Sequence, residues 1–428
     1  MVNLKRHAAL PLGLIGLAIV VGLLIHLYQL RGDGTLVLDD IRGDRAAIED
    51  VTISGVVKDG YHETAFRMEE GTMHTRTTLY DYPMRVRSNM LAASKEEYPV
   101  VIGSGEYDAE NAFYDGMGRY RIVRKNYNRN RSEMYRSYAI IETGLRYTGD
   151  KIPSTNRHEY GLAAIGDRLF FVPVTTSEYK GESGIYEVRS FQRYPNVRLK
   201  GEENDVRLLT PIALEEGKVE VLGLESVGGK LVLLLMKEGQ LVIQAYDGDT
   251  GKRIGELTVR ELVSVEAEGM AEHPAERFYP NYEAFSHPED EMITFRFDIA
   301  ADNKRAMRVI SLSVADGVER VHSQRLNYPG NQDRWKDFNY FIYLHDKLYM
   351  LTQVAYDYAD IHIPIASHKP RRIVIRVYSS DEELLYEGEL KTDMNADELE
   401  GILAKEAEVS GYSPSSVKAR IVDNIRIQ

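Results

Sequence analysis

The sequence contains no cysteine and only one tryptophan among 428 residues, and 66 acidic side chains outnumber 53 basic ones. Without cysteine the chain has no disulfide scaffold, no thiolate metal cluster, no cysteine nucleophile and no acylated lipoprotein cysteine. A net charge of −13 disfavours nucleic-acid binding, which needs a basic surface. The sequence also lacks G-x-S-x-G, H-E-x-x-H, P-loop and G-x-G-x-x-G units in the contexts where they act. We therefore expect no metal, no cofactor and no nucleic-acid partner.

One long uncharged run stands near the N-terminus. Residues 8–30 contain no Asp, Glu, Lys or Arg. At about 1.5 Å per residue a helix of this length spans roughly 34 Å, enough to cross the hydrocarbon core of a bilayer. A cleaved signal peptide is the alternative, but its apolar region is usually shorter and a small-x-small site follows it. We expect an uncleaved transmembrane signal-anchor helix over 8–30.

The flanks of this run predict its orientation. Lys5 and Arg6 precede it, whereas acidic residues, among them Asp33 and Asp39, follow it. Because positive charge stays on the cytoplasmic side, we expect residues 1–7 to be a cytoplasmic tail. A linker over 31–50 and an extracytoplasmic domain over 51–428 would follow, so that the protein is a single-pass protein of the cell membrane.

The remaining chain is patterned as strands. Short apolar or alternating runs recur between Gly, Asn, Asp and Pro, without a long stripe of helical period. The clearest stretch covers residues 229–257 and the two that follow, where Leu231–Met236, Leu241–Tyr246 and Arg253–Val259 are separated by two turns. Three strands joined by tight hairpins form a meander, which is the unit of a propeller blade.

This meander repeats. Similar strand openings begin at Leu169, Leu231, Met292 and Leu348, at intervals of about 60 residues. Weaker openings at 51–53 and 100–102 continue the series toward the N-terminus. The pattern predicts an all-β fold, a β-propeller of about six blades (five to eight) behind the N-terminal helix.

The segment Leu241–Lys252, with the sequence LVIQAYDGDTGK, resembles the strand and turn of WD40-like and quinoprotein-like β-propellers. The resemblance implies a fold and not an activity. No GH…WD pair accompanies it, and the lone Trp335 does not reproduce the tryptophan-docking pattern of quinoprotein enzymes.

The C-terminal part departs from this repeat. Asn395 and Glu398 have the spacing of a capping box, and apolar residues follow, so a short surface helix is expected over 396–407. Residues 417–427 alternate apolar and charged side chains. We expect them to form a strand that closes the propeller with the N-terminal strands.

Two segments are candidate binding sites. The first is an arginine- and tyrosine-rich stretch over 118–138, which predicts contacts with an anionic polymer or with lipid headgroups, because guanidinium groups match phosphate and carboxylate groups. Alternatively, it is an exposed strand face that neutralises nearby acids. Its candidate residues are Arg119, Arg121, Arg124, Lys125, Arg129 and Arg131.

The second is a polar loop between two strong strands of the last clear repeat, where a propeller rim often carries binding residues. Its candidates are Asp357, Asp360, His362 and His368, and the alternative is a solvated loop. A third segment, Asp247–Gly251, has the look of a calcium loop. Thr258 stands where an EF-hand needs glutamate, so a turn is predicted instead.

Taken together, these patterns predict a membrane-anchored extracytoplasmic β-propeller that acts as a non-catalytic binding or interaction module of the cell envelope. Its expected partners are the membrane and an envelope protein or anionic polymer. One alternative is a propeller-type glycan hydrolase or lyase, whose acids would come from Asp298, Asp302, Asp357 and Asp360. Another is a sensory subunit that acts through a partner membrane protein.

Overall fold

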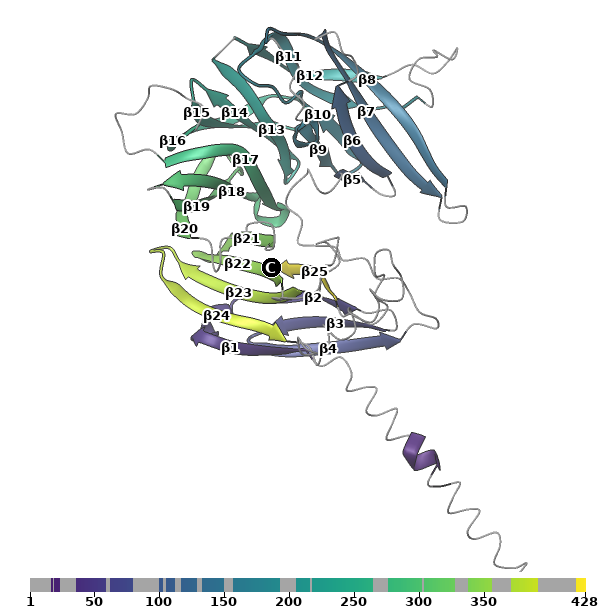
Figure 1. Cartoon of the computed structure of the whole chain (residues 1–428), viewed down its shortest axis with the longest axis vertical. Coiled ribbons are helices and arrows are strands. Elements are labelled where there is room, and N and C mark those ends of the chain that lie inside the picture. The colour runs from purple at the N-terminus through teal and green to yellow at the C-terminus, as the bar shows by residue number, and fades with distance from the viewer. Residues whose placement is uncertain are drawn as a thin grey trace, which may run out of the picture. The chain divides into compact units, whose positions relative to one another are not determined.

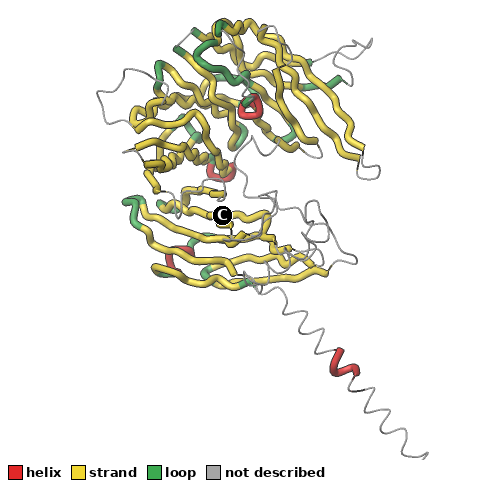
Figure 2. The backbone as a smooth tube through the Cα atoms, in the orientation of Figure 1, coloured by secondary structure: helices red, strands yellow, loops and turns green. Residues whose placement is uncertain are grey.

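A computed structural model describes most of the chain and consists almost wholly of strands (Figure 2). The described residues are 17, 19–23, 36–58, 62–79, 100–102, 105–111, 117–128, 133–149, 157–192, 205–215, 218–264, 276–301, 304–327, 338–355, 371–391 and 421–428. Short 3₁₀ turns, η1 (Arg45–Ile48), η2 (His158–Gly161) and η3 (Pro288–Asp290), interrupt the strands. The fold is therefore mostly β, as the sequence pattern predicts.

The predicted meander is present in the middle of the chain. It consists of β13 (Val219–Val227), β14 (Lys230–Lys237), β15 (Gln240–Asp247) and β16 (Arg253–Ser264), each antiparallel to the next (Figure 1). Glu238 and Gly239 join β14 to β15 with φ values of 50° and 79°. Two residues of positive φ make the tight turn whose twist matches antiparallel strands.

A second meander continues the same sheet. Its strands are β17 (Glu276–His287), β18 (Met292–Ala301), β19 (Lys304–Ser313) and β20 (Glu319–Asn327), again antiparallel in chain order. Leu262–Ser264 of β16 pair in parallel with Glu276–Phe278 of β17. The result is one eight-stranded sheet from β13 to β20.

Another eight-stranded sheet precedes it in the chain. Its order is β5-β6-β7-β8-β11-β10-β9, and β12 pairs with β11 outside this path. Here too, strands that follow each other in the chain form antiparallel pairs in runs of four, from β5 to β8 and from β9 to β12. The strands are β5 (Val100–Ile102), β6 (Gly105–Asn111), β7 (Met117–Asn128), β8 (Glu133–Tyr147), β9 (Leu162–Ile165), β10 (Arg168–Phe171), β11 (Tyr179–Val188) and β12 (Val206–Leu214).

Strands from the two ends of the chain share a sheet. The C-terminal strand β25 (Ile421–Ile427) pairs antiparallel with β2 (Ile53–Lys58), and β3 (His62–Glu69) and β4 (Thr72–Leu79) complete the order β25-β2-β3-β4. Ile53 and Ile427 are register partners and both are buried. This is the pairing expected of the C-terminal strand.

The last sheet gains a strand from the segment expected to be a linker. Its order is β1-β24-β23-β22-β21, formed by β1 (Val37–Gly43), β21 (Phe338–Leu344), β22 (Lys347–Ala355), β23 (Arg371–Ser379) and β24 (Leu384–Lys391). The expectation of a linker over 31–50 is thus wrong for 37–43. Leu38 is buried and the Tyr386 hydroxyl donates a 2.6 Å hydrogen bond to Asp40, so this segment is held in the sheet.

The described chain divides into two compact units. One contains Met1–Leu91, Asp333–Asn339 and Tyr349–Gln428, and the other contains Ala92–Gln332 and Tyr340–Leu348. In the first unit the hydroxyl of buried Tyr349 donates a 2.9 Å hydrogen bond to Asp50. The second unit holds the two eight-stranded sheets.

The core of the second unit depends on β14, which is buried on both faces. Leu231, Leu233 and Leu235 belong to a cluster with side chains of β7, β10 and β11. The intervening Val232, Leu234 and Met236 belong to a second cluster with side chains of β17, β18 and β19. Because both faces are covered, this strand reads as a continuous apolar run instead of an alternating one.

Two predicted helices lie wholly or mainly outside the described residues. They are the helix over 396–407 and most of the anchor over 8–30, of which Leu17 and residues 19–23 are described as helical. Within the described part of the chain, no helix has the length and hydrophobicity to span a bilayer.

The packing of β14 predicts the effect of one substitution. Leu234 is fully buried, so Leu234→Ala should lower the free energy of unfolding by about 2–5 kcal/mol through lost burial and a residual cavity. Chemical denaturation followed by circular dichroism measures this change. The matched control is Leu208→Ala on β12, where the side chain is 48% exposed and the change should stay within about 0.5 kcal/mol. Equal losses in the two variants would contradict the two-faced core.

Candidate functional site

A polar pocket lies where the core between the β13–β16 and β17–β20 meanders ends. On β19, Ala306, Ile310 and Leu312 point into that core and are buried there. Arg308 occupies the same face between Ala306 and Ile310. The pocket has a volume of about 420 Å³ and opens to solvent. Its lining residues come from three strands and are Glu261, Arg308, Arg320, Val321, His322 and Ser323.

Arg308 is held in place from β17. Its Nε and Nη2 atoms donate hydrogen bonds of 2.8 and 2.6 Å to the two carboxylate oxygens of Glu276. Arg325 of β20 lies 3.9 Å from the same carboxylate. Since the Arg308 and Glu276 side chains are only 16% and 13% exposed, this bidentate pair fixes the guanidinium plane within the pocket wall.

Arg320 is placed by an irregularity in β20. His322 pairs with Ser311 of β19 but Arg320 pairs with the next residue, so Val321 is an extra residue in the strand. Such a bulge bends the strand and redirects its side chains. Arg320 forms an ion pair with Glu261 of β16, and both of these side chains are partly exposed.

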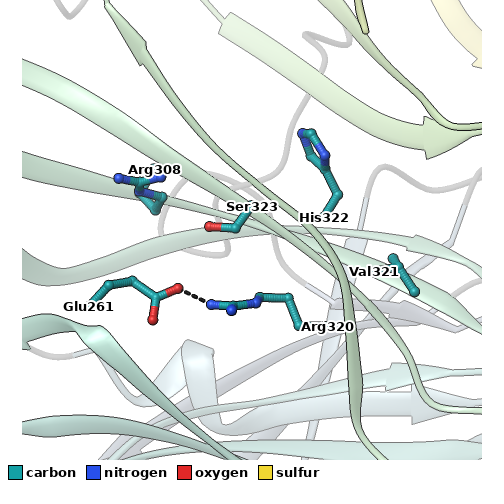
Figure 3. A pocket seen from close by; sticks show the side chains of 6 residues that line it. All are labelled: Glu261, Arg308, Arg320, Val321, His322 and Ser323. Carbon is teal, nitrogen blue, oxygen red and sulfur yellow. Dashed lines mark hydrogen bonds and ion pairs between the residues drawn. The ribbon is translucent and has the colours of Figure 1, made fainter. Parts of the chain in front are cut away.

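The Ser323 hydroxyl has no hydrogen-bond partner among the described residues, although its oxygen is buried. In Figure 3 this oxygen points into the space between Arg308 and the Glu261–Arg320 pair. Leaving a buried hydroxyl without a partner costs free energy. A ligand acceptor that binds next to Ser323 would therefore be stabilised by a hydrogen bond from this hydroxyl.

His322 lines the pocket but its ring is directed elsewhere. The imidazole stacks on Tyr343 with ring centroids 4.6 Å apart, and its Nε2 lies 3.2 Å from the side-chain oxygen of Gln324. Figure 3 shows it pointing away from the Ser323 hydroxyl. We therefore assign it a packing contact at the pocket wall.

The sequence reasoning did not identify this pocket. The usable signal was Arg308 within an otherwise apolar alternation on β19. Its partner Glu276 is 32 residues away, and 59 residues separate Arg320 from Glu261.

The predicted arginine- and tyrosine-rich stretch lies on β7 and β8. Arg119 pairs with Glu142 of β8 at 2.9 Å, Arg121 pairs with Glu110 of β6 at 2.9 Å, and Lys125 forms an ion pair with Asp108 of β6. Cross-strand acids thus neutralise these three cations, which is the arrangement of the alternative interpretation.

Arg124 lies on the other face of β7. Its guanidinium is 5.9 Å from the ring centroids of both Tyr107 and Phe191. Arg129 and Arg131 lie outside the described residues. Asp357, Asp360, His362 and His368 of the predicted binding loop do so as well.

The acids considered for glycan hydrolysis do not assemble among the described residues. Asp298 of β18 accepts a 2.5 Å hydrogen bond from Arg296, which also donates to Glu283. Asp302 lies outside the described part, like Asp357 and Asp360. Of the residues that are described, no three His, Asp or Glu side chains are grouped to hold a metal ion.

The turn at 247–251 has the predicted form. Asp247 Oδ1 accepts hydrogen bonds from the backbone N–H and the hydroxyl of Thr250, at 2.8 and 2.6 Å. Its carboxylate therefore caps its own turn.

A second polar feature is fully enclosed. His158 of η2 meets Tyr120 of β7 edge to face, with ring centroids 5.3 Å apart. Among the described residues, His158 Nδ1 and the Tyr120 hydroxyl have no hydrogen-bond partner. Burial lowers the pKa of His158 from 6.5 to about 4, because the apolar surroundings disfavour the imidazolium. Burial likewise raises the pKa of Tyr120.

The comparisons with known proteins identify no family. No family model matches the sequence, and no curated protein matches it either. Among solved structures, the chain is similar to oligopeptidase B from Trypanosoma brucei with covalently bound antipain, with 10% identity, a TM-score of 0.29, and 87% of this chain and 51% of that chain covered. A structure from work on two prolyl endopeptidases gives 9% identity, a TM-score of 0.27, and coverage of 80% and 42%.

A third similar structure is prolyl oligopeptidase B from Galerina marginata bound to a 35-residue substrate. It gives 10% identity, a TM-score of 0.26, and coverage of 75% of this chain and 37% of that chain. The chain thus spans about half or less of the length of these structures. Likenesses of this degree carry no argument about activity.

The buried histidine predicts a dependence of stability on pH. The unfolded chain binds a proton near pH 6.5 and the folded chain only near pH 4, so stability present above pH 6.5 is lost as the pH falls toward 4. The loss should reach about 3 kcal/mol in urea unfolding curves. His158→Phe keeps a ring against Tyr120 and should reduce this slope. The control His74→Gln, at an exposed position of β4, should leave it unchanged. An unaltered slope in His158→Phe would contradict the assignment.

Proposed function

We propose that this protein is a membrane-anchored, extracytoplasmic β-propeller that acts as a non-catalytic binding module of the cell envelope. In this proposal the propeller has about six blades, and residues 8–30 form the transmembrane helix that anchors it. An envelope protein or an anionic polymer is its partner.

The strand order supports the propeller. Strands follow one another as antiparallel runs of four, from β5 to β8, β9 to β12, β13 to β16 and β17 to β20. The pairing of β25 with β2 places both ends of the chain in one sheet. Such pairing is how a ring of blades is closed without a free edge.

The ion pair of Asp298 supports binding over catalysis, and it is the observation that carries the non-catalytic part of the proposal. A glycosidase acid must reach its substrate with an unoccupied carboxyl group. The Asp298 side chain is 9% exposed and is bound by the Arg296 guanidinium, whose own side chain is 10% exposed. This carboxylate serves as a structural counter-ion.

The anchor is supported by sequence alone. Residues 8–30 carry no Asp, Glu, Lys or Arg, and the positive charges lie before them. A run of this length and polarity matches the hydrocarbon thickness of a bilayer, and the charge bias directs the bulk of the chain outward.

The anchor predicts how the protein fractionates. The full chain should remain with membranes after washing with high salt and with alkaline carbonate, whereas a variant without residues 1–34 should be released. Immunoblots of the washed pellets measure this. Leu17→Arg combined with Val20→Arg, within the run, should also release the protein, because charges at the bilayer centre are costly. The control Leu4→Arg lies before the run and should stay bound. Retention of the truncated variant would overturn the anchor.

A further inference from the structure

We propose that the pocket formed by β16, β19 and β20 is a binding site for the carboxylate group of a small monocarboxylate. This inference goes beyond the proposed function and rests on it only in treating the ligand as bound and not converted. The argument uses Arg308, Arg320, Ser323 and Glu261.

The pocket wall offers several hydrogen-bond donors that no described residue uses. Arg308 binds Glu276 through Nε and Nη2, which leaves Nη1 without an acceptor in the described part of the chain. Arg320 uses Nη1 on Glu261 and keeps Nη2 available. The Ser323 hydroxyl is the third open donor. Donors that converge on one space call for an acceptor with at least two oxygens.

The charge of the pocket selects a monoanion. The charged side chains that line the pocket are those of Arg308, Arg320 and Glu261. The sum is one net positive charge. A carboxylate neutralises that charge, whereas a phosphate dianion would bring an excess negative charge next to Glu261. Planar guanidinium forks also match the two oxygens of a carboxylate.

The rest of the lining limits the ligand. Among the described residues of the lining, the one aromatic ring is that of His322, which is already stacked on Tyr343, and the one aliphatic side chain is that of Val321. The pocket, with a volume of about 420 Å³ and open to solvent, has room for a small carboxylate. Acetate and lactate are the probes of this binding.

Glu261 acts in this site as an internal competitor. Its carboxylate already occupies one face of Arg320 and repels a second anion. A bound carboxylate must share or displace this contact. Removing the charge of Glu261 should therefore strengthen binding, while removing the charge of Arg320 should weaken it. A purely structural ion pair would not respond with opposite signs.

The test is saturation-transfer-difference NMR on the full chain in detergent micelles, read on the methyl protons of acetate and lactate at constant ionic strength. Arg320→Gln should raise the dissociation constant about 10-fold, in line with the loss of a charged hydrogen bond. Ser323→Ala should raise it several-fold, and Glu261→Gln should lower it several-fold. The matched control is Arg253→Gln, which removes an arginine from an exposed ion pair with Glu256 elsewhere on β16 and should leave binding unchanged.

The outcomes are decisive in both directions. Circular dichroism confirms that each variant is folded before binding is compared. Absence of a transfer signal in the unmodified protein, or weaker binding by Glu261→Gln, would overturn the site. Phosphate that binds more tightly than acetate would overturn the carboxylate assignment. Chemical conversion of either probe would overturn the non-catalytic proposal and leave the binding site intact, so the two failures are distinguishable.

Discussion

The organisation of the second unit depends on one constraint, the burial of β14 on both of its faces. Its alternate side chains enter two different hydrophobic clusters, one shared with β7, β10 and β11 and the other with β17, β18 and β19. A strand so placed has no face left for charged side chains, and its neighbours must supply complementary apolar faces. Side chains from both eight-stranded sheets therefore pack against this one strand.

Several polar groups in these cores have charged or hydrogen-bonding partners, and their placement follows from the same constraint. Arg296 and Asp298 neutralise each other within β18, and buried Tyr282 donates a 2.8 Å hydrogen bond to Glu225 of β13. Arg308 is also paired with a carboxylate, that of Glu276. It lies where the apolar packing ends, and its Nη1 keeps hydrogen-bond donors that no described residue uses. Glu276 offsets the cost of desolvating the Arg308 guanidinium on one side only. The other side still needs polar surroundings, so a polar pocket forms there.

Local signals predicted the parts of the fold that local interactions determine. The strands β14 and β15 agree with the sequence within about one residue, because an apolar run and a turn of positive φ coincide at their ends. The linker expected over residues 31–50 is wrong for β1, whose partner β24 lies far along the chain and leaves no local signal. The pocket was missed for the same reason: its ion pairs join residues that are distant in sequence.

The pairing of β25 with β2 has a consequence for the order of events during synthesis. Ile53 emerges from the ribosome long before its register partner Ile427, which lies 374 residues further along the chain. Until β25 is made, β2 pairs with β3 on one side only, and its other edge stays open. An open edge is a template for pairing with another chain. The protein is thus exposed to misassembly while the residues between these two strands are made, and completing this sheet is a long-range step that slows folding.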